Sequence, residues 1–331
     1  MSIYPEESNR IKYPHRRFRR EQLKKDRELF IKKYSKSNWE TIKIPKHLNL
    51  LKKPDLLIST INRAYTLYRK GKNIHYDMKD CIEISPESIA VLVACISDNS
   101  FTNGMGSRGN LPQNYFVRNL IKESGFFDHV RLINGKHKSK GIMLHKITDN
   151  KVETDVAKET CLFVKDKVKA DYVDDMEPLY DVLVEVMQNT NNHAGLQEKG
   201  KYDWWFYRYE DQNKKIIHFT FLDIGVGIFQ SLSVMNYLRK FGNLVSLTSN
   251  IDLVDKLVKG EIKSRTGRLD RGKGIPQIFE LSKDNLYKDF YVLSNDVLIN
   301  AKTMEKKKLN KEFYGTLYYF TIEVKKYNYA G

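Results

Sequence analysis

The strongest pattern of apolar residues lies in the second half of the chain, directly after Pro178. Apolar side chains recur there at positions i, i+3, i+4, i+7 and i+8 counted from Leu179, which is the spacing of one face of an α-helix. Two strand-like segments follow, Tyr202–Tyr209 and Lys215–Asp223, and the polar residues between them are typical of a hairpin. The pattern therefore predicts a helix followed by a β-hairpin.

A long connection over 229–263 separates this hairpin from the next predicted elements. A helix is expected to start at Gly272 and to continue to Ser282. Three strands are predicted after it: Phe290–Ser294, Val297–Ile299 and Gly315–Val324. This order of elements predicts an α/β sandwich, with helices on one face of a mixed sheet.

The first half of the chain predicts a smaller α/β domain. Helical spacing covers Leu51–Lys70, Asn73–Asp77 has strand character, and Pro86 begins another helical stretch. The charged and weakly patterned segment from Lys136 to Asp174 is expected to contain the boundary between the domains. We therefore expect a leader over 1–40, a regulatory or docking domain over 41–150, a linker over 151–174 and the α/β sandwich over 175–328.

The composition of the chain argues against a disordered, membrane-spanning, secreted or disulfide-rich protein. The chain has 331 residues, of which 41% are hydrophobic, and this is enough to build packed cores. No apolar run approaches the ~18 residues of a membrane-spanning helix, and the first residues lack the apolar segment of a secretory signal. Three cysteines are too few for a disulfide framework or a zinc site. These features predict a soluble, cytoplasmic protein with no membrane partner.

Positive charge is concentrated at the start of the chain. The formal net charge is +16, and residues 1–36 hold twelve lysines and arginines against five acidic residues. Residues 10–36 could form a basic arm that lies on the phosphates of nucleic acid. A solvated, partly helical leader is the more common explanation of such a segment. No aromatic interleaving or zinc-knuckle spacing accompanies the charge, so the sequence offers no support for base recognition.

Candidate chemistry begins on the helix after Pro178. Glu185, Asn189 and His193 stand at i, i+4 and i+8, so they form a polar stripe beside the apolar face. A carboxylate and an amide oxygen in this arrangement can share the water shell of Mg²⁺, which takes few protein ligands when phosphate oxygens are present. The carboxylate could also activate a nucleophile. By itself the stripe is also compatible with an ordinary solvated helix face.

Three glycine-containing motifs follow in the sequence. Asp223 ends an apolar strand and precedes Gly225 and Gly227, so a carboxylate able to accept from an exocyclic amine stands beside backbone that can approach a flat ring closely. The run Arg271, Gly272, Lys273 and Gly274 enters a helix, where free amides and positive charge favour phosphate. Gly315 and Thr316 start a late strand. Taken singly, the first two are also compatible with a tight turn and a glycine-rich helix entry.

Together and in this order, the four motifs resemble those of the GHKL ATPase superfamily, the Bergerat-fold group that includes gyrase and the histidine kinases. The stretch from Glu185 to Ala194, EVMQNTNNHA, resembles the N-box. The motifs at Asp223–Gly227, Gly272–Ile275 and Gly315–Thr316 resemble the three glycine boxes. The resemblance covers about residues 175–325 and implies ATP and Mg²⁺ as cofactors.

The resemblance also implies roles for individual residues. Glu185 would position or activate the nucleophile, Asn189 would bind Mg²⁺, and Asp223 would take the adenine amino group. The segment between the first two glycine boxes would be the ATP lid. Residues implied to surround the nucleotide are Gly225, Gly227, Arg271, Gly272, Lys273, Gly274 and Thr316.

Residues 74–130 resemble, more distantly, the STAS domains of anti-sigma-factor antagonists. Asp77–Pro86 is similar to the strand-to-helix turn of that fold, and Glu123–Phe127 to the end of a later helix. The phosphorylatable serine of the family would fall near Pro86 or Glu87, so Ser85 and Ser88 are only neighbours of its position. A plain α/β module explains the region nearly as well.

These observations lead to one functional hypothesis and two alternatives. The leading hypothesis is a cytosolic, Mg²⁺-dependent switch that hydrolyses ATP or phosphorylates a protein serine or threonine, with a protein partner that could be of STAS type. The alternatives are a nucleic-acid-associated GHKL ATPase, in repair or phage defence, and an ATP-gated interaction module without turnover. A conventional histidine kinase is disfavoured because no histidine lies on a heptad-patterned helix before the ATPase region.

Overall fold

The fold is taken from a computed structural model of the chain. The structure describes residues 38–129, 131–132, 143–148, 152–168, 176–193, 202–232, 249–262 and 274–324. Most of the basic leader, together with Arg271, Gly272 and Lys273 of the second glycine box, lies outside these residues. Mixed helix and strand content confirms the α/β class expected from the sequence pattern.

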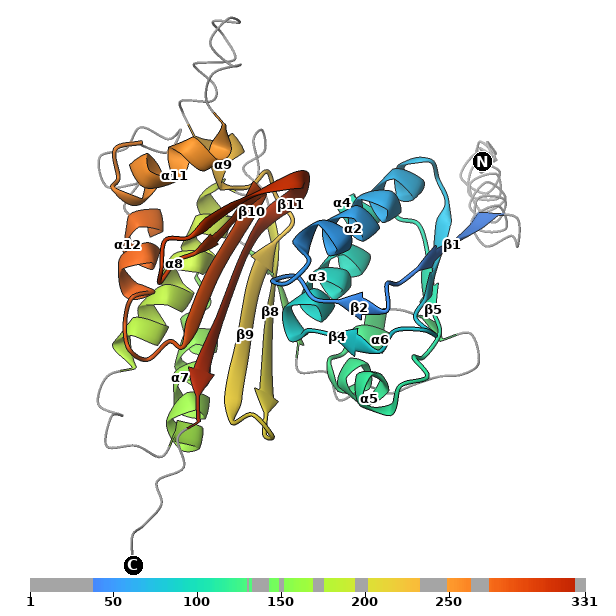
Figure 1. Ribbon diagram of the computed structural model, residues 1–331, viewed down its shortest axis with the longest axis horizontal. Coiled ribbons are helices and arrows are strands. Elements are labelled where there is room, and N and C mark those ends of the chain that lie inside the picture. Colours follow the sequence, from blue (N-terminus) through green and yellow to red (C-terminus); the bar gives the residue numbers. More distant parts are fainter. Residues whose placement is uncertain are drawn as a thin grey trace, which may run out of the picture.

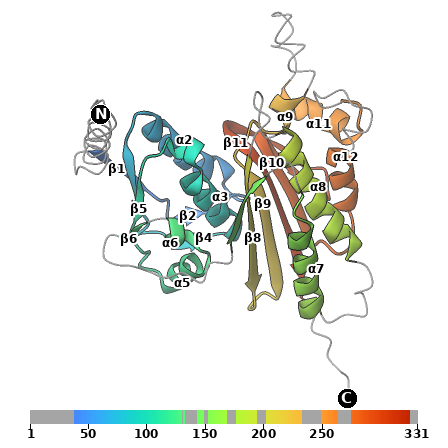
Figure 2. The same cartoon turned by 180° about the vertical axis from the view of Figure 1, so that it is seen from behind.

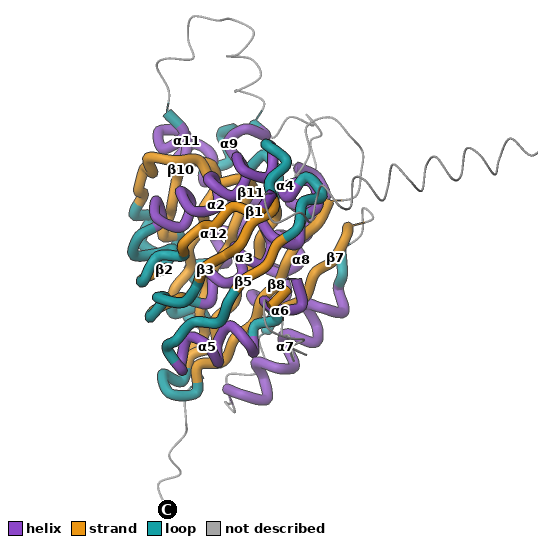
Figure 3. The backbone as a smooth tube through the Cα atoms, turned by 90° about the vertical axis from the view of Figure 1, so that its right-hand side faces the viewer, coloured by secondary structure: helices purple, strands orange, loops and turns teal. Residues whose placement is uncertain are grey.

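The first half of the chain forms a four-stranded sheet in the order β1-β3-β5-β6, whose described pairings are all parallel. Figure 3, which looks onto this side of the molecule, shows β1, β3 and β5 next to one another in front. A short parallel pair, β2 and β4, lies beside it. The strands are β1 (Trp39–Lys43), β2 (His47–Leu48), β3 (Asn73–Asp77), β4 (Glu83–Ile84), β5 (Ser107–Gly109) and β6 (Arg131–Leu132).

Helices connect these strands. The helix after β4 starts with a proline at its first position and is buried from Glu87 to Ile96, as expected of a helix enclosed on all sides. The helices of this half are α2 (Pro54–Arg69), α3 (Pro86–Ser97), α4 (Asn99–Thr102), α5 (Tyr115–Glu123) and α6 (Phe126–His129).

The second half forms a five-stranded sheet in the order β10-β11-β9-β8-β7. All of its described pairings are antiparallel, so the expected mixed sheet is wrong for this part of the molecule. Short connections between β8 and β9 and between β10 and β11 permit only antiparallel neighbours. The strands are β7 (Met143–Thr148), β8 (Tyr202–Asp211), β9 (Ile216–Asp223), β10 (Asp289–Asn300) and β11 (Lys306–Glu323).

Helices of the second half cover one face of this sheet, as Figure 2 shows most clearly for α7 and α8. A buried stripe on α8 contains Leu179, Val182, Leu183 and Val186 and packs against Phe219 and Phe221 of β9 in a single apolar cluster. The helices are α7 (Thr154–Val168), α8 (Glu177–His193), α9 (Ile228–Ser231), α11 (Asn250–Val258) and α12 (Gly274–Leu281).

The boundary between the halves differs from the expected one. β7 pairs with β8, so residues 143–148 belong to the five-stranded sheet and not to the first domain as proposed over 41–150. The proposed linker over 151–174 contains α7, whose buried residues join the core of the second half. β7 is defined by its pairing with β8, more than fifty residues later, which no local pattern reveals. α7 does carry a local signal that the sequence analysis missed, because its buried residues Val156, Thr160 and Val164 stand at helical spacing.

The two halves share a hydrophobic core. α2 and α3 pack against the second face of the five-stranded sheet, where Trp205, Leu222 and Leu317 belong to the same apolar cluster as the first half. The Trp205 indole Nε1 donates to Ser97 Oγ over 2.9 Å across this contact. Figure 1 shows the resulting layers as sheet, helices, sheet and helices. The five-stranded sheet is therefore covered by helices on both faces, and not on one face only as predicted.

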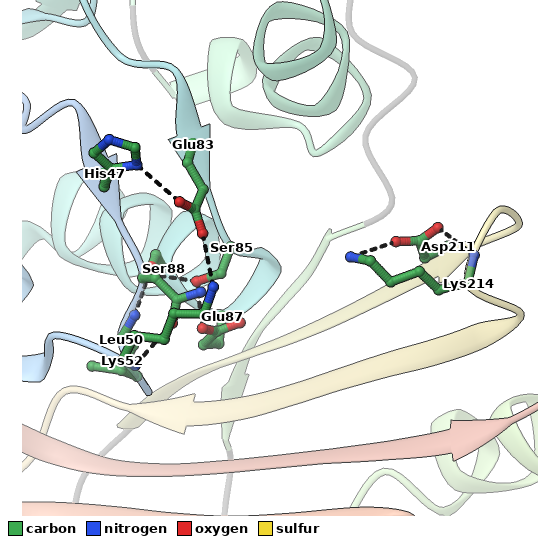
Figure 4. A network of polar contacts seen from close by, with 10 residues as sticks. His47, Leu50, Lys52, Glu83, Ser85, Glu87, Ser88, Asp211 and Lys214 are labelled. Atoms are coloured by element: carbon green, nitrogen blue, oxygen red, sulfur yellow. Dashed lines mark hydrogen bonds and ion pairs between the residues drawn. The ribbon is translucent and has the colours of Figure 1, made fainter.

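Ser85 and Ser88, the two serines closest to the STAS-like position, lie in a buried polar cluster at the start of α3 (Figure 4). Ser88 Oγ accepts from the backbone N–H of Leu50 over 3.0 Å and lies 2.8 Å from Ser85 Oγ. The Ser85 hydroxyl donates to the Glu87 carboxylate. Burial raises the pKa of Glu87, against the opposing effect of the Ser85 hydrogen bond. These contacts give both serines a structural role in holding the Leu50 segment against α3.

None of the helices in the described ranges combines the length and the apolar character required to cross a membrane.

Candidate functional site

Glu185 and Asn189 lie half-buried on α8, one turn apart, beside the apolar face of the helix. Gly274, the first residue of α12, faces both of them. A Cβ atom added to Gly274 would lie 2.8 Å from Glu185 Oε2 and 2.9 Å from Asn189 Oδ1. The first motif and the described end of the second glycine box therefore lie next to each other, and a side chain at position 274 would require Glu185 and Asn189 to shift.

The Glu185 carboxyl is in a setting that disfavours its charge. Burial raises its pKa, and the negative charge of Asp181, one turn earlier on the same helix, raises it further. A carboxylate with a raised pKa is a better proton acceptor at neutral pH than an exposed one. The side chain of His193, the third member of the predicted stripe, lies outside the described residues.

Asp223 is the last residue of β9 and lies between Trp204 of β8 and Thr316 of β11 in the strand register. Its side chain is buried, and Thr190 Oγ1 of α8 donates to Asp223 Oδ2 over 3.4 Å. Burial raises the pKa of Asp223 to about 7, although backbone hydrogen bonds from Thr316 and Gly225 and the Thr190 hydroxyl act in the opposite direction. Asp223 is therefore an acceptor held in a dry environment at the end of the sheet.

Two glycines allow the backbone to close tightly around Asp223. Gly227 has φ +78°, and a Cβ there would lie 2.5 Å from Asn295 Oδ1. Gly315 has φ +97°, and a Cβ there would lie 1.9 Å from the Asp223 carbonyl oxygen and 2.8 Å from the Gly225 nitrogen. The motif at Gly315–Thr316 thus supports the motif at Asp223–Gly227 through direct backbone contact.

Gly315→Ala is expected to destabilise the protein by about 2 to 5 kcal/mol, since a left-handed backbone costs about 1 to 2 kcal/mol for alanine and overpacking adds about 1 to 3 kcal/mol. The free energy of unfolding from denaturant titration measures this loss. Gly71→Ala is the matched control, because Gly71 has φ +72° but nothing within 4 Å of an added Cβ. Equal losses in the two variants would show that the contact with Asp223 has no energetic weight.

The buried Trp204 Nε1 lacks a hydrogen-bond partner among the described residues. The Asn189 side chain lies close enough to the Tyr318 hydroxyl to lower its pKa against the effect of burial. Tyr318 faces the same side of the sheet as Asp223, and its pKa is raised by burial and then by the charges of Asp223 and Glu185. A buried polar atom without a partner is costly in a folded protein. Donors and acceptors thus converge between α8 and the end of β9, as a site for a polar ligand requires.

Among the predicted site residues that the structure describes, Gly274 lies against Glu185 and Asn189, and Gly225 and Thr316 donate backbone hydrogen bonds to Asp223. Gly227 lies against Asn295. Tyr318 connects the two groups, because the charges of both Asp223 and Glu185 raise its pKa. Arg271, Gly272 and Lys273 lie outside the described residues. Sequence reasoning missed Thr190, Ser294, Asn295 and Tyr318. A signal existed for two of these, because the polar run Ser294–Asn295–Asp296 interrupts an otherwise apolar strand.

The described residues contain no group of three or more His, Cys, Asp or Glu side chains placed to hold a metal ion. Glu185 and Asn189 together offer carboxylate and amide oxygens, which are ligands for Mg²⁺. Mg²⁺ usually takes one or two protein ligands and completes its shell with water and substrate phosphates. The pair would supply at most two protein ligands to such an ion.

No family model matches the sequence, and the comparison with curated proteins finds no significant match.

Proposed function

We propose that this protein binds ATP and Mg²⁺ between α8, the end of β9 and the start of α12, and that it transfers the γ-phosphoryl group to water or to a protein side chain. The observation that carries the proposal is the approach of Gly274 to Glu185 and Asn189. It supports a phosphate-binding end of the site, because this is where a helix begins and backbone amides point outward.

Asp223 is proposed to bind the adenine base, at the end of the site opposite the phosphates. Its carboxylate can accept a hydrogen bond from the exocyclic amine of adenine, and Gly225, two residues later, has no side chain that would keep a flat ring away from the backbone. Trp204 is fully buried next to it and stacks on Phe221 with ring centroids 5.2 Å apart, which makes the floor of this end rigid and apolar. A buried acceptor in an apolar setting discriminates strongly against bases that lack the matching donor.

Each group at the phosphate end has a distinct role in the proposed reaction. Bound Mg²⁺ would neutralise charge that develops on the phosphate oxygens. Asn189 would supply one of its ligands, while Glu185 would accept a proton from the attacking hydroxyl or orient it. Arg271 and Lys273 are proposed to add positive charge near the phosphates.

In the proposed function, the protein acts as a switch that depends on a protein partner. The first half of the chain packs on the face of the sheet opposite α8, and Ile224, next to Asp223, packs against the core of that half. Nucleotide binding at Asp223 and partner binding to the first half would therefore act on the same strands. A STAS-type protein is one partner class that this proposal admits.

Incubation of the purified protein with Mg²⁺ and γ-labelled ATP, followed by separation of free phosphate from protein, tests the proposal. We expect ATP to bind in calorimetry and label to appear as free phosphate or on a protein. Bound ATP with neither product would support a gating module without turnover. Failure of ATP to bind, with and without Mg²⁺, would refute the proposal.

A further inference from the structure

Ser294 and Asn295 interrupt β10 at a point where its pairing with β11 is irregular. The register shifts on both sides of Asn295, which marks a β-bulge. Asn295 also has φ +51° and is only 2% exposed. Left-handed backbone at a buried residue other than glycine carries an energetic cost and is retained where the surrounding structure requires it.

The Asn295 side chain contacts the loop that follows Asp223 at two points. Its Nδ2 donates to the carbonyl oxygen of Val226 over 3.0 Å, and its Oδ1 accepts from the backbone N–H of Phe229 over 3.2 Å. Gly227 lies directly on this amide, since an added Cβ would come within 2.5 Å of Oδ1. One amide therefore holds both sides of the turn in place.

Ser294 adds a third attachment to the same loop. Its hydroxyl oxygen accepts from the backbone N–H of Ile228 over 2.8 Å. The hydroxyl also lies within 3.2 Å of the Gly315 carbonyl oxygen and 3.3 Å of Thr316 Oγ1. The Ser294 side chain thus ties the loop after Asp223 to the strand that lies beside Asp223.

We propose that Ser294 and Asn295 are positioning residues for base recognition, and that they hold the loop 224–227 and the start of α9 at the distance at which Asp223 and the adjacent backbone select adenine. This inference rests on the proposed function, because it assigns a selecting role to residues beside the nucleotide base. The bulge in β10 allows the Ser294 and Asn295 side chains to contact this loop. Without these contacts the backbone groups of Val226, Ile228 and Phe229 lose buried partners and the loop is free to move.

Asn295→Gly tests the proposal, because glycine accepts the left-handed backbone and removes only the amide. Asn103→Gly is the matched control, since Asn103 has the same φ of +51° but is exposed at the end of α4. Affinities for ATP and GTP are measured by calorimetry, and the unfolding midpoint is recorded for each variant. We expect Asn295→Gly to weaken ATP binding at least tenfold and to reduce the ratio of ATP to GTP affinity, with both values unchanged in Asn103→Gly.

A merely structural role would lower the unfolding midpoint and the active fraction but would leave the ATP to GTP ratio of the folded protein unchanged, and this result would overturn the inference. If Asn295→Gly does not fold, Asn295→Asp serves in its place, because it keeps the acceptor for Phe229 and loses the donor to Val226. The same reduced ratio is expected, and an unchanged ratio again overturns the inference. Wild-type protein that does not bind ATP would refute the proposed function itself, which separates the two failures.

Discussion

Glu185→Gln is expected to reduce phosphoryl transfer or hydrolysis by roughly 100-fold to 10,000-fold, the usual contribution of a positioned general base, while ATP affinity changes little. Glutamine has nearly the same shape as glutamate, so the space opposite Gly274 remains filled, but the amide cannot accept a proton. Burial and Asp181 raise the pKa of Glu185 above the ordinary carboxyl value of 4.5. As pH falls, Glu185 should therefore be protonated, and activity of the wild-type protein should decline, at a higher pH than for an ordinary carboxylate. Initial rates measured across pH, beside ATP affinity from calorimetry, check both statements.

Glu280→Gln is the control for this variant. Glu280 is exposed on α12 and forms an ion pair with Lys283, with 2.9 Å between the charged atoms. It shares its residue type with Glu185 and lies on the helix that Gly274 begins, so it reports any general effect of losing a carboxylate there. Retention of full turnover by Glu185→Gln would remove Glu185 from the proposed chemistry.

Asp223→Asn is expected to weaken ATP binding by at least 100-fold, on the order of the loss seen when a buried polar group faces a substrate without its partner. The substitution places an amide donor where adenine also presents a donor. Equilibrium binding of ATP measures this effect. Asp211→Asn is the control, because Asp211 ends the neighbouring strand β8, at the opposite end of the β8–β9 hairpin, where it pairs with Lys214 (Figure 4).

The same substitution should stabilise the nucleotide-free protein. The pKa of Asp223 rises from its usual 3.8 to about 7 on folding, so between these values the native state binds a proton that the unfolded state does not. Stability attributable to Asp223 therefore falls as pH rises from about 4 to 7. At about 1.4 kcal/mol per pKa unit, the advantage of Asn at pH 8 has an upper limit of about 4 kcal/mol. Urea unfolding of both proteins at pH 5 and pH 8 tests this, and an advantage that does not grow with pH would contradict it.

Opposite effects of one substitution on binding and stability would distinguish a ligand-binding carboxylate from a structural one. A structural aspartate contributes to stability through its partners, so its loss destabilises the fold. Burial disfavours the charged form of Asp223 near neutral pH, and groups with such raised pKa values cluster at functional sites.

Much of the fold could be predicted from local periodicity. The apolar stripe after Pro178 corresponds to α8, the predicted strand Asn73–Asp77 is β3, and the helical spacing over Leu51–Lys70 corresponds to α2. The hairpin predicted at Tyr202–Tyr209 and Lys215–Asp223 corresponds to β8 and β9. These elements were predictable because burial on one face repeats at the period of the element itself.

Elements whose partners lie far away in the sequence were not predictable in the same way. Two predicted strands, Phe290–Ser294 and Val297–Ile299, form the single strand β10, with a bulge at the junction. β11 starts at Lys306, well before the predicted Gly315. The prediction missed the first residues of this strand because they are lysine-rich and lack an apolar pattern. β7 lies in a charged segment and owes its strand conformation to pairing with β8.

The linear order of residues determined which chemical groups this protein has and the helix and strand ends on which they stand, since spacing and turn chemistry are local properties. Folding alone decided that Gly274 touches Glu185 and Asn189, that Gly315 closes on Asp223, and that the first half of the chain covers the back of the sheet. Folding also brought Asn295, which lies outside every predicted motif, into contact with the loop beside Asp223. Contacts of this kind depend on which faces pack together to exclude water, and that choice is made by the whole chain at once.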